Sequence, residues 1–215
     1  NSTVLMIHLN RPWSLRLLTN LRLLSFLCLV AVYASGCIDP GEKLEAEYRE
    51  RMSRGMASGT DLYRRGDFAA ARKEFDTARE IAEAYYEPDG RDAVASITWQ
   101  ARAEAARGAT AEAEKLFDLL IERLRARDVR LKAQGIEPNF DLPLALEESA
   151  DIASSAGRQD VAASRRLEAR TIWMAGFGPD PENVRTNLRK LADRYRAMQM
   201  PEEMHLVSSR AASFE

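Results

Sequence analysis

Carboxylates at helical spacing are the residues of this 215-residue chain that could most readily support chemistry. Glu147 and Asp151 are four positions apart, with Glu148 between them, so a helix would place the outer two on one face. Two such groups in a buried cleft could perform general acid–base catalysis. On an alanine-rich helix, however, carboxylates are usually solvated or paired with arginine. We find no glycine-rich phosphate loop, serine nucleophile motif or zinc motif in the sequence, and we therefore expect no enzyme and no catalytic residue.

Metal and nucleic-acid binding are also disfavoured. The chain has two histidines and two cysteines, and no cysteine or acidic cluster surrounds His205 at ligand spacing, so we expect no metal and no cofactor. The net charge of −2 argues against a general nucleic-acid binder. We interpret the basic run from Arg123 to Lys132 as a solvated face at the end of a long helix. Contact with anionic lipid or a phosphate-bearing polymer is the alternative.

Residues 1–36 have the pattern of a secretory signal. They contain three arginines and no acidic residue, and an apolar run follows over residues 23–34. A membrane-spanning helix needs about 20 apolar residues, so this run is too short for one. We therefore expect residues 1–36 to be a signal peptide that is not part of the fold.

The end of this segment, Ala-Ser-Gly-Cys at 34–37, resembles the lipobox of bacterial lipoproteins, although leucine is usual where Ala34 stands. The resemblance implies cleavage before Cys37 and acylation of that cysteine, which would anchor the chain without a spanning helix. Because Ile38 rather than aspartate follows the cysteine, we expect an outer-membrane anchor facing the periplasm. The alternatives are the inner membrane, a soluble periplasmic product after ordinary cleavage, and an uncleaved anchor. Residues 37–41 would then be the lipidated cysteine and a tether.

Residues 42–215 read as helices throughout. They are rich in alanine, leucine, glutamate and arginine, and no stretch alternates β-branched and aromatic residues as strands do. Glycines and prolines break this region into eight expected helices, approximately 42–64, 67–86, 91–107, 110–134, 143–156, 160–175, 182–198 and 201–213.

The helical region repeats internally. When it is aligned on four turn residues, Gly66, Gly108, Gly157 and Gln199, a small residue recurs seven positions before each turn. Small residues at such positions let a partner helix approach closely. The small residues are Gly59, Ala101, Ala150 and Ala192.

The first unit resembles the tetratricopeptide repeat (TPR), a helix–turn–helix of about 34 residues. The residues that carry this resemblance are Gly59, Leu62, Gly66, Phe68, Ala71, Phe75 and Ala78. The second unit matches at Gly108, Ala113 and Phe117 but has Glu104 where an aromatic residue or leucine is usual.

Later units depart further from the TPR pattern. In the third, Gly157 is followed by Ala162 or Ala163 and then Leu167, as though one residue were inserted, and the fourth matches only in its first helix. The resemblance implies an all-α solenoid of helical hairpins, TPR-like, with about eight helices in four units. A plain antiparallel bundle is the alternative.

In TPR arrays the first helix of each unit lines a concave groove. The groove-facing positions would be Met56, Thr60, Tyr63, Arg64, Thr98, Arg102, Glu147 and Asp151. Such a wall, basic at one end and acidic at the other, suits an extended peptide or a partner helix. We therefore expect a lipid-anchored scaffold or adaptor that binds another envelope protein. A constitutive subunit of a large membrane complex and a cell-wall-active enzyme are the alternatives.

Overall fold

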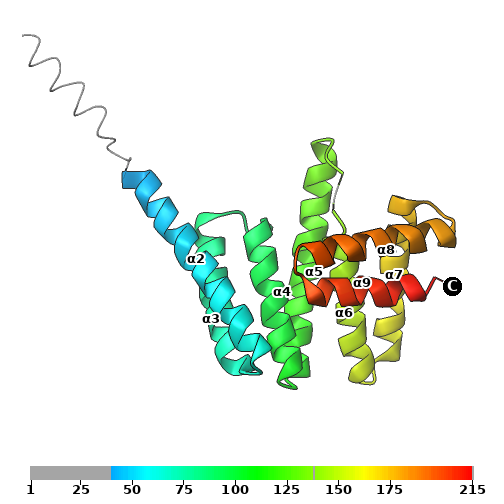
Figure 1. The fold of residues 1–215 in the computed structure, drawn as a ribbon, viewed down its shortest axis with the longest axis horizontal. Coiled ribbons are helices and arrows are strands. Elements are labelled where there is room, and N and C mark those ends of the chain that lie inside the picture. The colour runs from blue at the N-terminus through cyan, green and yellow to red at the C-terminus, as the bar shows by residue number, and fades with distance from the viewer. Residues whose placement is uncertain (1–39, 138, 215) are drawn as a thin grey trace, which may run out of the picture. The chain divides into compact units, whose positions relative to one another are not determined.

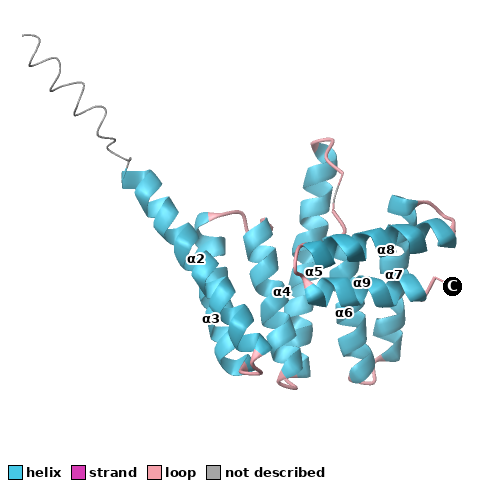
Figure 2. Cartoon of the chain, in the orientation of Figure 1, coloured by secondary structure: helices cyan, strands magenta, loops and turns pink. Residues whose placement is uncertain are grey.

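The computed structural model describes residues 40–137 and 139–214, and every regular element within them is a helix (Figure 2). The chain divides into two compact units, residues 1–46 and 47–215. Of the first unit, only the start of α2 is described. The predicted signal segment and Cys37 lie outside the described residues. The last two residues of the predicted tether, Pro40 and Gly41, are the first two of α2.

The expected all-α class is confirmed, and each helix bound lies within two residues of the bound expected from the sequence. The helices are α2 (Pro40–Arg64), α3 (Phe68–Tyr85), α4 (Arg91–Ala106), α5 (Thr110–Ala133), α6 (Asp141–Ser155), α7 (Gln159–Phe177), α8 (Pro181–Ala197) and α9 (Pro201–Ala212). None of the described helices is long and apolar enough to cross a membrane.

Left-handed backbone follows six of the described helices, including the four that end at the turn residues used to align the units. Gly66, Gly108 and Gly157 have φ angles of 83°, 82° and 79°, and Gln199 has a φ of 57°. These are the four positions on which the sequence units align. Glycine adopts this conformation without a steric cost, whereas the Cβ of glutamine is strained there. The four turns therefore have similar backbone geometry, although the last has glutamine in place of glycine.

Most helices pack on their neighbours in the chain. Close pairs form between α3 and α4, α4 and α5, α5 and α6, α6 and α7, and α8 and α9 (Figure 1). Gly59 joins α2 to α3, because it faces the ring of the fully buried Phe75. The α8–α9 hairpin runs across the direction of α4–α7 and contacts α7 and α6 (Figure 1). The last hairpin therefore returns over a helix from the middle of the chain.

The recurring small residues all lie inside this packing. Gly59, Ala101, Ala150 and Ala192 are buried. Twelve positions after each turn residue, a second set is buried as well, namely Ala78, Leu120, Ala169 and Ala211.

This register corrects the expected insertion in the third unit. Ala162 is fully buried, five positions after Gly157, as Ala71 and Ala113 are after their own turn glycines. Leu167 is 65% exposed and does not take the place of the repeat's aromatic residue. The unit has no extra residue, because Arg166 stands at the aromatic position.

An aromatic cluster closes the α5–α6 connection. The Phe140 ring lies 5.0 Å from that of Trp173 and 4.5 Å from that of Phe177, measured between ring centroids. Phe177 is the last residue of α7, where the sequence pattern ended the helix at residue 175. Its ring extends the helix end by packing on Phe140 and the buried Trp173.

Candidate functional site

Six of the predicted groove residues form one surface, called here the inner face: Tyr63, Arg64, Thr98, Arg102, Glu147 and Asp151. They come from α2, α4 and α6, the first helices of three units. The α8–α9 hairpin lies against this face. Tyr63, Arg102 and Asp151 line a cavity of about 310 Å³ together with side chains of α9. Arg64 lines another, of about 330 Å³, with residues of the α8–α9 turn.

Arg102 is the polar centre of the inner face. Its guanidinium donates to both carboxylate oxygens of Glu148 in α6, at 2.8 and 2.6 Å, and to Glu203 in α9, at 2.8 Å. The side chain is only 7% exposed and stacks over Trp99, with 4.9 Å between the guanidinium carbon and the ring centroid. Burial works to lower the pKa of Arg102, but the charges of Glu148 and Glu203 outweigh it and raise the pKa. Arg102 therefore holds α4, α6 and α9 together as a charged triad.

The other two predicted carboxylates receive an arginine from α9. Arg210 donates through Nη2 to both oxygens of Asp151, at 2.7 and 2.8 Å, and its Nε lies 2.9 Å from Glu147 Oε2. Burial raises the pKa of Glu147 to about 7, and the nearby charge of Arg210 only partly opposes this shift. Glu147 is not among the residues that line the adjoining cavity, whereas Asp151 is. The two carboxylates considered for acid–base catalysis, Glu147 and Asp151, therefore both bind the guanidinium of Arg210.

The other two predicted groove residues, Met56 and Thr60, make contacts within α2 or between α2 and its neighbours. The Thr60 hydroxyl donates to the Met56 carbonyl at 2.8 Å, and the Met56 sulfur accepts from the Ser96 hydroxyl at 3.5 Å. Met56 also packs against the apolar residues between α2 and α3. The structure therefore does not bring Met56 and Thr60 onto the surface that α9 covers.

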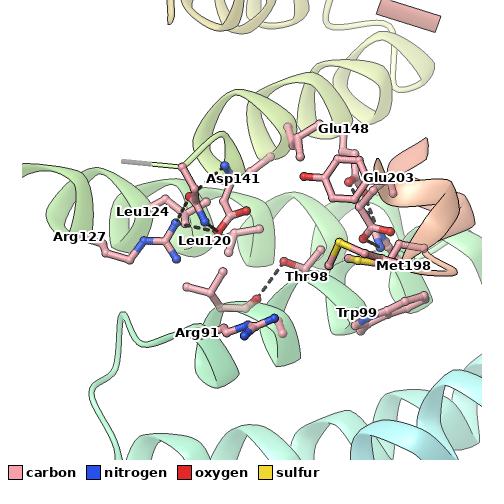
Figure 3. A pocket seen from close by; sticks show the side chains of 18 residues that line it. Arg91, Thr98, Trp99, Leu120, Leu124, Arg127, Asp141, Glu148, Met198 and Glu203 are labelled. Atoms are coloured by element: carbon pink, nitrogen blue, oxygen red, sulfur yellow. Dashed lines mark hydrogen bonds and ion pairs between the residues drawn. The ribbon is translucent and has the colours of Figure 1, made fainter. Parts of the chain in front are cut away.

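A third cavity beside the inner face, called here the slot, has a volume of about 500 Å³. It is lined by α4, α5, α6 and the α8–α9 turn, and Leu120, Leu124 and Thr98 lie along it (Figure 3). Arg127, which is paired with Asp141 at 2.8 Å, lies at one end of the slot, and Glu203 lies at the other (Figure 3), where it is paired with Arg102. Cavities of this size accept small ligands or the side chains of a peptide.

Several slot residues carry no sequence signal. Arg91 is exposed at the start of α4, and within the described part of the chain its guanidinium has no ion-pair partner. Met198 and Met200 reach the slot from the α8–α9 turn, and Tyr195 reaches it from the last turn of α8. Burial raises the pKa of Tyr195 to about 12. Sequence spacing could not identify them, because they meet α4 only through the direction that the last hairpin takes.

The basic residues at the end of α5 form ion pairs with neighbouring elements. Arg123 pairs with Glu83 at 2.7 Å, and Arg130 lies 3.1 Å from Asp89, both on the side of α3 and its following loop. On the other side, Arg125 pairs with Glu168 at 2.7 Å, while Arg127 pairs with Asp141. This run therefore joins hairpins, and its charges are largely neutralised within the chain.

Among the residues that the structure describes, no group of three histidine, cysteine or acidic side chains could hold a metal ion. His205 is exposed and borders the cavity beneath α9.

No protein-family model matches this chain, and no curated protein matches it in sequence. The inner face and the slot therefore have to be interpreted from their own geometry.

Proposed function

We propose that this chain is a TPR-like solenoid that binds another protein through the inner face and the slot. The neighbour-to-neighbour packing of α3–α7 supports a solenoid, as do the four left-handed turns and the small residue buried before each. A protein of this kind acts as a scaffold or adaptor, because its helices offer surface rather than reactive groups.

The slot is the observation that carries this proposal. Its floor is aliphatic, with Leu120 and Leu124 only 1% exposed, and its polar groups at both ends are already paired. Apolar side chains of a partner would therefore leave water on entering the slot, and the Arg127–Asp141 ion pair at its far end would stay intact. The unpaired Arg91 adds one position where the partner could supply a carboxylate.

Membrane anchoring through Cys37 is the second part of the proposal. Acyl chains on this cysteine would hold the repeats at the outer membrane on the periplasmic side, and tethering would raise the effective concentration of a membrane-bound partner. Metabolic labelling with an alkyne fatty acid tests it. Label on the wild type and none on Cys37→Ser would support the anchor, whereas equal labelling would contradict it.

Site-specific photocrosslinking tests partner binding. A photoreactive amino acid at Thr98 lies in the slot, and one at Val129, which is 70% exposed on α5, serves as the matched control. After brief irradiation of native membranes, we expect one protein to crosslink at residue 98 and not at 129. Crosslinks confined to residue 129 would instead favour a constitutive subunit that uses another face. Absence of any protein crosslink at either position would overturn the proposal.

The enzymatic alternative has its own test. We propose no catalytic role for Glu147 and Asp151, because Arg210 engages both carboxylates. Substituting both by alanine removes any acid–base chemistry of the pair. Loss of the cellular phenotype while Thr98 crosslinking is retained, in a chain that circular dichroism shows to be folded, would favour the enzyme, whereas joint loss of both is expected if the pair only binds the partner.

A further inference from the structure

A helix already occupies the inner face, and its contacts define what that face recognises. Glu203 and Arg210 are the two charged anchors of α9: the first meets Arg102, and the second meets Glu147 and Asp151. They are seven residues apart, which is about two helical turns, so they project from nearly the same side of α9. The inner face thus accepts a carboxylate and a guanidinium spaced about 10 Å along one helix.

The receiving groups belong to the array rather than to the hairpin. Arg102 lies in α4, and Glu147 and Asp151 lie one turn apart in α6. Arg102 keeps a second carboxylate from Glu148, and Asp151 keeps a second guanidinium from Arg166, at 2.9 Å. The array would therefore retain its charge pattern if α9 moved away.

The α8–α9 hairpin shares the main apolar cluster with α4–α7, but its two helices contact each other more than they contact the rest of the chain. The connection to α7 is the short segment from Gly178 to Asp180, in which Gly178 has a φ of 95°. Within the described residues, Glu203 and Arg210 provide the ion pairs that join α9 to α4 and α6.

We propose that α9 is an internal ligand of the inner face, and that the external partner is a protein helix with an acidic residue followed seven positions later by arginine. This inference rests on the proposed function and names the chemistry of its partner. The partner competes with α9 for Arg102 and for the Glu147–Asp151 pair. Its apparent affinity is the intrinsic affinity multiplied by the fraction of chains in which α9 is not seated.

Fluorescence polarisation with the full chain tests this competition. The probe is a fluorescein-labelled synthetic peptide of residues 199–214, and a second peptide carries the exchanged charges Glu203→Arg and Arg210→Glu. The protein variant Glu203→Gln with Arg210→Gln, called here the released variant, removes both charged anchors of α9 and leaves the residues of the array and the apolar residues of α9 unchanged. Its matched control, Arg189→Gln with Asp193→Asn, removes the same charge types from exposed positions of α8.

We expect the native peptide to bind the released variant at least about tenfold more tightly than it binds the wild type or the control. The exchanged peptide should bind much more weakly. If both peptides bind alike, or if the released variant is folded by circular dichroism and binds neither, the inference is overturned.

Photocrosslinking at Thr98 separates this result from the proposed function. A partner captured more strongly by the released variant supports both. Capture that is unchanged in that variant, with no peptide binding, would refute the internal ligand and leave the adaptor proposal standing. Peptide binding without any captured protein would refute the adaptor proposal and the external partner with it, and would leave only α9 as a ligand of the inner face.

Discussion

Replacing Gly59 by alanine should destabilise the protein, although the same substitution usually favours a helix. A Cβ added at Gly59 would lie 2.5, 2.7 and 2.9 Å from three carbons of the Phe75 ring. Phe75 is fully buried, so its ring has no open space into which it can turn. At Gly55, one turn earlier in α2, an added Cβ would lie 3.2 Å from the Glu74 carbonyl oxygen and 3.5 Å from the Ala78 Cβ. The same substitution in the same helix therefore meets a ring at residue 59 and no ring at residue 55.

The expected magnitude follows from two opposing effects. Alanine in place of glycine stabilises a helix interior by about 0.5–1 kcal/mol. Overpacking a buried interface costs about 1–3 kcal/mol. We therefore expect Gly59→Ala to lower the free energy of unfolding by about 1–2 kcal/mol. Gly55→Ala should change it by less than about 0.5 kcal/mol, because the gain in propensity offsets a mild contact.

Urea denaturation followed by far-ultraviolet circular dichroism measures both variants. A third variant, Gly59→Ala with Phe75→Leu, replaces the ring that causes the clash with a smaller side chain. Its destabilisation should be smaller than the sum of the two single effects, because the two residues touch. The reasoning about close approach of α2 and α3 is refuted if Gly59→Ala is as stable as Gly55→Ala, or if the double variant is simply additive.

Three further predictions concern the turns and the inner face. The pKa of Glu147 is raised from 4.5 to about 7, so folding favours the protonated carboxyl. The free energy of unfolding of the wild type, relative to that of Glu147→Gln, should therefore be highest below pH 4.5 and should fall by up to about 3 kcal/mol as the pH rises to about 7. Parallel unfolding curves between pH 4 and 8 measure that difference, and a constant difference would contradict the burial argument. Gln199→Gly should stabilise the fold by about 0.5–1 kcal/mol, since it relieves left-handed strain, and Gly157→Gln should destabilise it; chemical denaturation that shows the same sign for both would contradict this. Arg102→Met should cost about 3–5 kcal/mol by leaving Glu148 and Glu203 without their cation, and a loss below about 1 kcal/mol in thermal unfolding would show that the triad is not needed.

The helices and their turns were predictable because local residues determine them. Proline opens α8 and α9, and glycine ends α2 and α4, so each boundary can be identified from a few neighbouring residues. Gln199 was predicted as a turn residue only from its spacing, since its own side chain gives no such signal. The third unit was misaligned because Leu167 is apolar, and the sequence does not show that it faces solvent.

Only half of the candidate site could be predicted from the sequence. The spacing of Glu147 and Asp151 placed both on one helix face, and Arg102 was identified from its position in the second unit. Their partners Glu203 and Arg210 could not be found, because the path of the last hairpin depends on packing between α7 and α8 rather than on a repeat. Arg91 and Arg127 were missed as slot residues because the slot forms only where α4, α5 and α6 meet the last hairpin, which no local pattern shows.

The ion pair between Arg102 and Glu203 joins residues 101 positions apart, whereas most packing joins consecutive helices. Local contacts of the latter kind form quickly, and closing a long loop waits until both ends exist. During synthesis, α2–α7 can therefore fold one after another while the C-terminal segment is still being made. For that interval the newborn chain presents Arg102 and the Glu147–Asp151 pair uncovered. If the proposed helical partner were present at the site of synthesis, it would meet the protein before its own last helix arrives, and the order of arrival would decide which helix is bound first.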